Sequence, residues 1–161
     1  MAVMASVETF LQRAHVSFVT VAHAAAHTAP REAAEAHVRR RCWAKTVVCF
    51  ADNKPIQAVV PADLAVNLKR LRRVVAARAL RLATEADLTK LYPECEAGAM
   101  PPLGPMYGQP VFVDQTLAAE PEIAFSGGTH SDAILLDYVA FAKAARPVVG
   151  AFSAARRSRS E

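Results

Sequence analysis

The sequence predicts a single α+β domain, in which a mixed and mostly antiparallel sheet is flanked by helices. Short β-branched apolar runs alternate with helical patterns along a chain of 161 residues, a length typical of one domain. Several of these runs are separated only by turns, as in hairpins, and they outnumber the pairs joined by a helix long enough for a parallel crossover. No internal repeat is visible.

The N-terminal half is predicted to hold two helices and three strands. Apolar residues at helical spacing predict an amphipathic first helix: Val3, Val7, Phe10, Leu11 and Ala14. A β-branched run over 16–22 predicts a strand, and Pro30 opens the next helix, since proline is well tolerated in a first helical turn. Strands over 43–51 and 56–60 then form a hairpin around a turn at 53–55.

The C-terminal half is predicted to continue with helices and short strands in turn. Four apolar residues on one helical face predict a helix: Leu64, Leu68, Leu71 and Val75. After a strand over 81–83, Thr84 and Asp87 have the spacing of a capping box and begin another helix, which Pro93 ends. The remaining elements are strands over 110–114, 122–126 and 133–136 and a last helix over 137–145.

Composition excludes several classes of protein. Hydrophobic residues make up 53% and charged residues 21%, as in globular proteins, and no run approaches the roughly 18–20 apolar residues of a membrane span. Residues 1–15 lack a basic start followed by an apolar block, so we do not expect a signal peptide there. Cys42, Cys49 and Cys95 show no paired spacing, which favours reduced thiols in a cytoplasmic protein.

The net charge of +4 is concentrated in clusters of arginine and lysine. Such clusters are ordinary on solvated helix faces, but they also attract the phosphate backbone of nucleic acids whatever its sequence. Composition alone leaves both interpretations open. The clusters contain Arg39, Arg40 and Arg41 with Lys45, Lys69 and Arg70 with Arg72 and Arg73, and Arg156, Arg157 and Arg159 near the C-terminus.

Two glycine-containing stretches are candidates for a functional site. Residues 94–105 hold three prolines and two glycines among apolar residues, which is unlike a solvated connector and indicates a shaped surface of main-chain amides. Residues 126–132 place Gly127 and Gly128 shortly before His130, and adjacent glycines let a ligand approach the backbone closely. A tight β-connection with an exposed histidine explains 126–132 equally well. Neither stretch has the spacing of a nucleophile elbow or a phosphate loop.

A metal site is only weakly indicated. His23 and His27 have the i, i+4 spacing of a metal-binding pair, but the stretch around them is not clearly helical. A third ligand would have to come from elsewhere in the chain, and the candidates are Cys95, Asp114 and His130. The pattern therefore lacks the compact ligand spacing that is typical of zinc sites.

Lys45 is a better candidate for chemistry than any cysteine. Cys49 and Cys95 would need a nearby base to act as nucleophiles, and a buried or incidental thiol is the simpler explanation for each. Lys45 lies at the start of an apolar strand, where a lysine must either extend its ammonium group to solvent or point into a cleft. This placement is suggestive but unspecific when taken alone.

The order of these stretches resembles the YbaK/ProX family of trans-editing aminoacyl-tRNA deacylases, which are free-standing relatives of the editing insertion of bacterial prolyl-tRNA synthetases. The stretches that carry the resemblance are residues 44–48, 59–62, the loop 96–104 with its GxxxP motif, 110–114, and 127–130. The resemblance covers roughly residues 23–152. It implies an editing domain over 1–152, followed by a basic and flexible tail over 153–161.

The resemblance implies a role for each matching position. The family lysine falls on Lys45, the GxxxP loop on Gly98 to Pro102, and the substrate-selecting turn on Gly127 to His130. The expected catalytic residues are therefore Lys45, Gly98 and His130. The expected substrate-binding residues are Ala99, Met100, Pro101, Pro102, Gly127, Gly128 and Thr129. The tRNA acceptor stem is expected to contact Arg39, Arg40, Arg41, Lys69, Arg70 and Arg73.

The family hydrolyses the ester that joins a wrong amino acid to the terminal adenosine of a tRNA, and it uses no metal, other cofactor or covalent protein intermediate. The resemblance thus implies a mischarged tRNA as partner, with a small amino acid such as alanine, serine or threonine. An aminoacyl-tRNA synthetase is a further candidate partner, no membrane partner is expected, and a monomer is the default. Three alternatives stay open: a tRNA- or nucleotide-binding module without hydrolysis, a metal-dependent hydrolase using His23, His27 and His130, and a purely structural domain.

Overall fold

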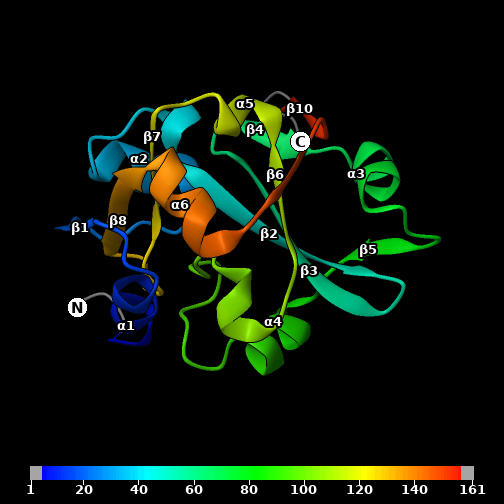
Figure 1. Cartoon of the computed structure of the whole chain (residues 1–161), viewed down its shortest axis with the longest axis horizontal. Coiled ribbons are helices and arrows are strands. Elements are labelled where there is room, and N and C mark those ends of the chain that lie inside the picture. Colours follow the sequence, from blue (N-terminus) through cyan, green and yellow to red (C-terminus); the bar gives the residue numbers. More distant parts are fainter. Residues whose placement is uncertain (1–4, 157–161) are drawn as a thin grey trace.

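The computed structural model describes residues 5–156, which form three β-sheets surrounded by helices (Figure 1). In the five-stranded sheet the order is β5 (Leu80–Leu82), β2 (Ala44–Ala51), β3 (Lys54–Pro61), β6 (Val111–Asp114) and β9 (Val148–Gly150). β2 pairs antiparallel with β3 and β5, whereas β6 and β9 are parallel to β3. The predicted α+β class with mostly antiparallel pairing is confirmed.

Two smaller antiparallel sheets complete the fold. The first has the order β1 (Val19–Ala22), β8 (Asp132–Asp137) and β7 (Glu122–Ser126), and the second pairs β10 (Ser153–Ala155) with β4 (Leu64–Val66). An isolated bridge between Trp43 and Ala124 connects the start of β2 to β7. The three-stranded sheet thereby lies against the end of the five-stranded sheet that carries Lys45.

The helices are short and cover the sheets. They are α1 (Ala5–Arg13), α2 (Ala29–Glu35), α3 (Leu68–Val75), α4 (Glu85–Leu91), α5 (Gln115–Ala118) and α6 (Tyr138–Ala145), with the 3-10 turns η1 (Arg40–Cys42) and η2 (Gly104–Tyr107). The predicted capping box of α4 is present: Thr84 Oγ1 accepts from Asp87 N (3.1 Å) and Asp87 Oδ2 from Thr84 N (2.9 Å). Within residues 5–156, no helix is long and apolar enough to cross a membrane.

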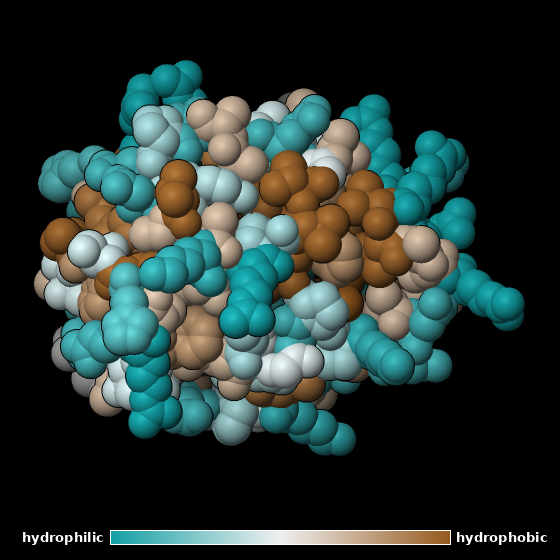
Figure 2. All heavy atoms as spheres, viewed as in Figure 1, coloured by the Kyte–Doolittle hydropathy of each residue, from teal (hydrophilic) through white to brown (hydrophobic). Residues whose placement is uncertain are grey.

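Alternation along the strands builds a core on each face of the five-stranded sheet. Val111 and Val113 of β6 pack in a core that includes Phe125 of β7 and residues of α1 and α6. Phe112, between them, points to the opposite face and packs in a core with Leu71 of α3. Hydrophilic side chains project over α3 and β5 at the right of Figure 2, beside an apolar area of the surface.

The helix predicted from Leu64 begins later than expected. Leu64 pairs with Ala155 as part of β4, so the leucine spacing there was a wrong indication of helix. Asn67 caps the helix by accepting a hydrogen bond from Arg70 N (3.0 Å), and α3 starts at the next residue. Pairing with a strand more than eighty positions away overrode the local period.

Other differences also come from tertiary pairing. The hairpin turn lies earlier than predicted, at Asp52 and Asn53, whose φ angles are +48° and +67°. α5, β9 and β10 were not predicted, and Ser153–Ala155 of the predicted tail form β10. The remaining tail positions 157–161, with Arg157 and Arg159, lie outside the described residues, as does Val3 of the predicted first helix.

Candidate functional site

A cavity of about 370 Å³ lies beside the first half of β2 and brings Lys45 and Gly98 together. β5 pairs with β2 only at Cys49, Phe50 and Ala51. The part of this edge of β2 that lies nearer Lys45 is therefore not covered by β5, and the cavity forms there. The lining comes from α2 and the two residues before it, β2, the end of β5 and the residue after it, the middle of α4, and the GxxxP loop. Its residues are His27, Thr28, Ala29, Glu32, Lys45, Thr46, Val47, Val48, Leu82, Ala83, Leu88, Gly98 and Met100.

Lys45 is half-buried, and its side chain is held by the neighbouring strand. Its Nζ donates a hydrogen bond to the main-chain oxygen of Leu64 (2.7 Å). Burial lowers the pKa of Lys45, the nearby positive charge of Arg156 lowers it further, and the carboxylate of Asp63 acts in the opposite direction. Lys45 lines the cavity, and its ammonium group is therefore held in place by the main chain of β4.

Gly98 has a backbone conformation that suits glycine, with a φ of +85°. A Cβ atom at this position would lie 3.4 Å from Cε1 of His130, so the histidine ring packs directly on the loop. Glu96 ties the loop to the turn that carries His130: Glu96 N donates to Gly128 O (2.9 Å), and His130 N donates to Glu96 Oε1 (2.6 Å). The GxxxP loop and the glycine turn, predicted separately, form one unit.

The imidazole of His130 is buried, with 6% of the residue exposed. Its Nε2 makes a hydrogen bond with the main-chain oxygen of Ala97, and since a carbonyl only accepts, Nε2 carries the proton. Nδ1 faces the carboxylate of Glu32 at 3.5 Å from Oε1. The ring of His27 stacks edge-on at 4.9 Å between centroids. Both ring nitrogens of His130 are thus directed at protein groups, and the ring supports the loop.

The predicted substrate-binding residues are divided by the fold. Met100 lines the cavity next to Gly98. The other six predicted positions are buried and do not line the cavity: Ala99, Pro101, Pro102, Gly127, Gly128 and Thr129. Thr129, for example, donates its hydroxyl to Oδ2 of Asp132 (3.0 Å) and so shapes the turn.

Sequence reasoning missed Glu32, which lines the cavity from α2 although it is only 2% exposed. The packing of α2 makes this residue noticeable. Glu32 precedes Ala33 and lies four residues before Ala36, and both alanines are buried. Helical spacing therefore puts this carboxylate on the buried face of α2, where an acidic residue is unusual.

A buried polar network fixes the far end of the GxxxP loop. Gln57 of β3 is fully buried, and its Nε2 donates to Pro101 O (3.1 Å) and to Tyr92 Oη (3.2 Å). The hydroxyl of Tyr92 in turn donates to Oε1 of Gln109. Burial raises the pKa of Tyr92 to about 12, so the phenol stays a donor. The loop is attached to the centre of the sheet through these groups.

Replacing Tyr92 with phenylalanine is expected to lower the free energy of unfolding by about 1–3 kcal/mol, because Gln57 and Gln109 each lose a partner in a buried place. Urea denaturation measures the difference. Tyr107→Phe is the matched control, since the hydroxyl of Tyr107 makes only a 3.7 Å contact with the sulfur of Cys95. Equal losses in the two variants would contradict the importance of the network.

The other chemistry-bearing residues do not converge. Within residues 5–156, no three histidine, cysteine or acidic side chains are placed to hold a metal ion. Asp114, one candidate ligand, instead accepts hydrogen bonds from Phe152 N and Ser153 N (2.8 Å each). Burial raises the pKa of each thiol, that of Cys49 to about 11, which disfavours a thiolate nucleophile.

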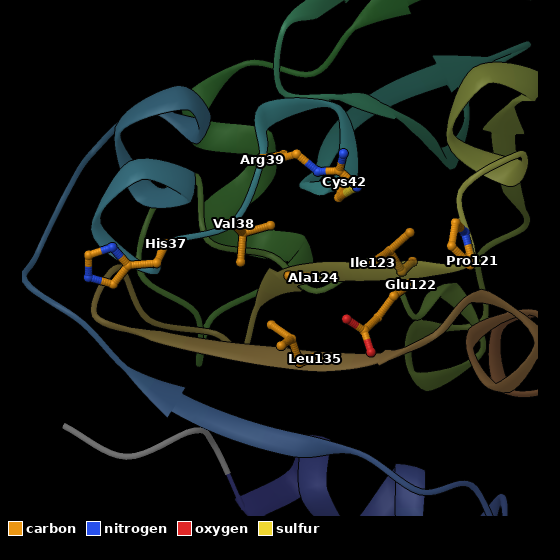
Figure 3. A pocket seen from close by; sticks show the side chains of 9 residues that line it. All are labelled: His37, Val38, Arg39, Cys42, Pro121, Glu122, Ile123, Ala124 and Leu135. Atoms are coloured by element: carbon orange, nitrogen blue, oxygen red, sulfur yellow. The ribbon is translucent and has the colours of Figure 1, made fainter.

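A second cavity, of about 290 Å³, lies between η1 and the strands β7 and β8 (Figure 3). Of the predicted site residues it contains only Arg39. Its lining residues are His37, Val38, Arg39, Cys42, Pro121, Glu122, Ile123, Ala124 and Leu135. Since Lys45 and Gly98 line the cavity beside β2 and not this one, we assign the candidate site to the cavity beside β2.

A family of known domains matches most of the chain. The family model for the aminoacyl-tRNA editing domain matches residues 23–144. None of the curated proteins matches the sequence.

Solved structures share the fold at low sequence identity. Hypothetical protein APE2540 has a TM-score of 0.82 and 18% identity, covering 92% of this chain and 99% of its own. A proposed trans-editing enzyme for prolyl tRNA synthetase has a TM-score of 0.79 and 20% identity, covering 94% and 98%. A proposed signal transduction protein from Marinobacter aquaeolei VT8 has a TM-score of 0.73 and 16% identity, covering 93% of this chain and 30% of its own.

Proposed function

Because the chain belongs to the aminoacyl-tRNA editing domain family, we propose that it hydrolyses the ester of a mischarged tRNA in trans, in the cytoplasm. The observation that carries this proposal is the cavity that Lys45 and Gly98 line together. Ester hydrolysis needs a polarised carbonyl, a water molecule and stabilisation of the departing ribose oxygen. Fixed donors in a partly dry cavity suit the first and third of these needs.

Each predicted catalytic residue then has a distinct role. The Lys45 ammonium group anchors the phosphate or ribose of the terminal adenosine and offsets the negative charge that develops there. Main-chain N–H groups near Gly98 hold the ester carbonyl oxygen or the adenosine. His130 acts as a positioning residue, because its nitrogens are directed at Ala97 and Glu32, and its ring supports Gly98 from behind.

The basic clusters are proposed to bind the tRNA acceptor stem. Arg40 lies close to the segment that holds Lys45. The main-chain oxygen of Arg40 accepts a hydrogen bond from Ala62 N (3.0 Å), and two residues later the main-chain oxygen of Leu64 accepts one from Lys45. The side chains of Arg39, Arg40 and Arg41 are exposed there, as those of Lys69, Arg70 and Arg73 are on α3. Phosphate contacts of this kind position a nucleic acid without reading its sequence.

The α3 cluster lies at the other end of the β4–β10 pair. Arg70 donates to Ser153 O (3.2 Å), whose strand partner is Val66, whereas Lys45 contacts Leu64. The two clusters therefore flank a short two-stranded sheet beside the cavity. We place the acceptor end over η1 and the more distant stem over α3.

The direct test is a panel of tRNAs mischarged with alanine, serine, threonine and other amino acids, incubated with the protein while release of the amino acid is measured. We expect acceleration over spontaneous hydrolysis for at least one small amino acid, because apolar side chains such as Val48 and Met100 narrow the cavity. Binding of tRNA without acceleration for any amino acid would overturn the proposal in favour of a non-hydrolytic tRNA-binding module. The same panel with an added synthetase tests whether that enzyme is a partner.

The charge environment of Lys45 gives a pH prediction. Loss of the positive charge in Arg156→Gln is expected to raise the pKa of Lys45, so its ammonium form persists to higher pH. Loss of the carboxylate in Asp63→Asn is expected to lower that pKa. The ¹³Cε NMR shift of Lys45, titrated in each variant, measures both changes. If both variants shift the pKa of Lys45 in the same direction, this charge environment is contradicted. The alkaline limb of the pH–rate profile of deacylation should shift with the pKa measured by NMR.

A further inference from the structure

Glu32 is a buried carboxylate at the cavity wall with an incomplete set of partners. Its Oε2 accepts a hydrogen bond from the hydroxyl of Ser126 (2.8 Å), and its Oε1 lies 3.5 Å from Nδ1 of His130. Among residues 5–156, no lysine or arginine lies within ion-pair distance of it. Burial raises the pKa of Glu32, which reflects the cost of an anion without a full counter-ion.

The facing nitrogen of His130 is also unsatisfied. Nε2 of His130 is engaged with Ala97 O, and Nδ1 faces Oε1 of Glu32 at 3.5 Å without a hydrogen bond between them. Nδ1 is buried and has no hydrogen-bond partner. Oε1 of Glu32 accepts no hydrogen bond from the described residues, and Glu32 lines the same cavity as Gly98. A group with N–H donors and a positive charge, bound in the cavity, would satisfy this oxygen.

On the basis of the proposed function, we propose that Glu32 binds the α-ammonium group of the aminoacyl ester through Oε1. An α-amino group is largely protonated at neutral pH, and it carries three donors. The substrate is then held by opposite charges, with its ammonium at Glu32 on α2 and its phosphate or ribose at Lys45 on β2. The ester carbonyl lies between them, near Gly98. This arrangement gives the substrate one direction of binding and favours amino acid esters over neutral acyl esters.

The test compares two esters that differ only in this group. The first is whichever of alanyl-, seryl- and threonyl-tRNA the wild type hydrolyses fastest, and the second is its α-hydroxy acid analogue, in which a hydroxyl replaces the ammonium group. We expect the wild type to prefer the amino acid ester by at least about 10-fold in kcat/KM, the size expected for a hydrogen bond to a charged group. In Glu32→Gln the ratio should approach one, mainly through loss on the amino acid ester.

Two controls separate this role from a structural one. Glu35→Gln, one turn along α2, should keep both rates, and Ser126→Ala should keep the preference because Oε1 is retained. Circular dichroism checks that each variant is folded. If Glu32→Gln lowers kcat/KM equally for both esters, or leaves the preference for the amino acid ester unchanged, the inference is overturned while the proposed function stays intact. A wild type that hydrolyses neither ester would overturn the proposed function, and this inference with it.

Discussion

Replacing Lys45 with alanine is expected to reduce deacylation of a mischarged tRNA by about 10²–10³-fold, the usual effect of removing one positioned donor from an active site. Lys45 lines the cavity, and in the proposed mechanism its ammonium group offsets the negative charge that develops on the leaving ribose. Alanine leaves the strand pairing with Val60 possible and removes only the hydrogen bond to Leu64 O. The measurement is single-turnover release of the amino acid, with excess protein.

The variant is also expected to remain folded, because the lost hydrogen bond contributes only about 1 kcal/mol. Lys54→Ala is the matched control, since Lys54 is an exposed lysine on the neighbouring strand β3 and is remote from the cavity lining. That variant should keep wild-type activity. Lys45→Ala with activity close to that of the wild type would remove Lys45 from the site and, with it, the main support for the mechanism.

Replacing Gly104 with alanine is expected to cost the largest amount of stability, about 3 kcal/mol or more, as overpacking of a tight site does. A Cβ atom at Gly104 would lie 2.1 Å from the main-chain oxygen of Gln109 and 2.6 Å from Cγ2 of Val111. A main-chain oxygen cannot turn aside as a flexible side chain can. The loop that carries Gly98 and the start of β6 must therefore separate to admit one methyl group.

Guanidinium denaturation measures this loss, and Gly108→Ala provides the comparison. A Cβ atom at Gly108 meets no atom within 4 Å, so only its φ of +68° penalises alanine, by about 1–2 kcal/mol. Gly104→Ala should therefore unfold at clearly lower denaturant than Gly108→Ala. The reverse order would show that backbone conformation matters more here than the contact with Gln109.

Local rules predicted much of the fold correctly. Thr84 and Asp87 form a capping box because both partners lie within one helical turn, and no distant residue is needed. The hairpin of β2 and β3 was predictable for the same reason, since its partners are adjacent in the chain. At Leu64 the local pattern failed, because this residue belongs to a strand whose partner, Ala155, is distant in the chain.

The candidate site divides in the same way. Lys45 and the GxxxP loop were predicted from short motifs, and the fold places Lys45 and Gly98 in one cavity. Glu32 was missed, because an acidic residue in a helix is normally solvated and only burial against Ser126 and His130 makes it noteworthy. The support of the loop by Gln57 was equally unpredictable, since a glutamine in a strand has many possible partners.

The sequence by itself determined the class of fold, most of the secondary structure and the family, because these depend on residue spacing and on motifs that are contiguous in the chain. Only the tertiary structure decided which groups share the cavity and which stand behind it. It turned His130 from an exposed candidate into a buried support whose proton lies on Nε2, and it set Glu32 opposite Nδ1. The physical reason is that burial and pairing change what a charged or polar side chain can do, and both are properties of neighbours far away in the sequence.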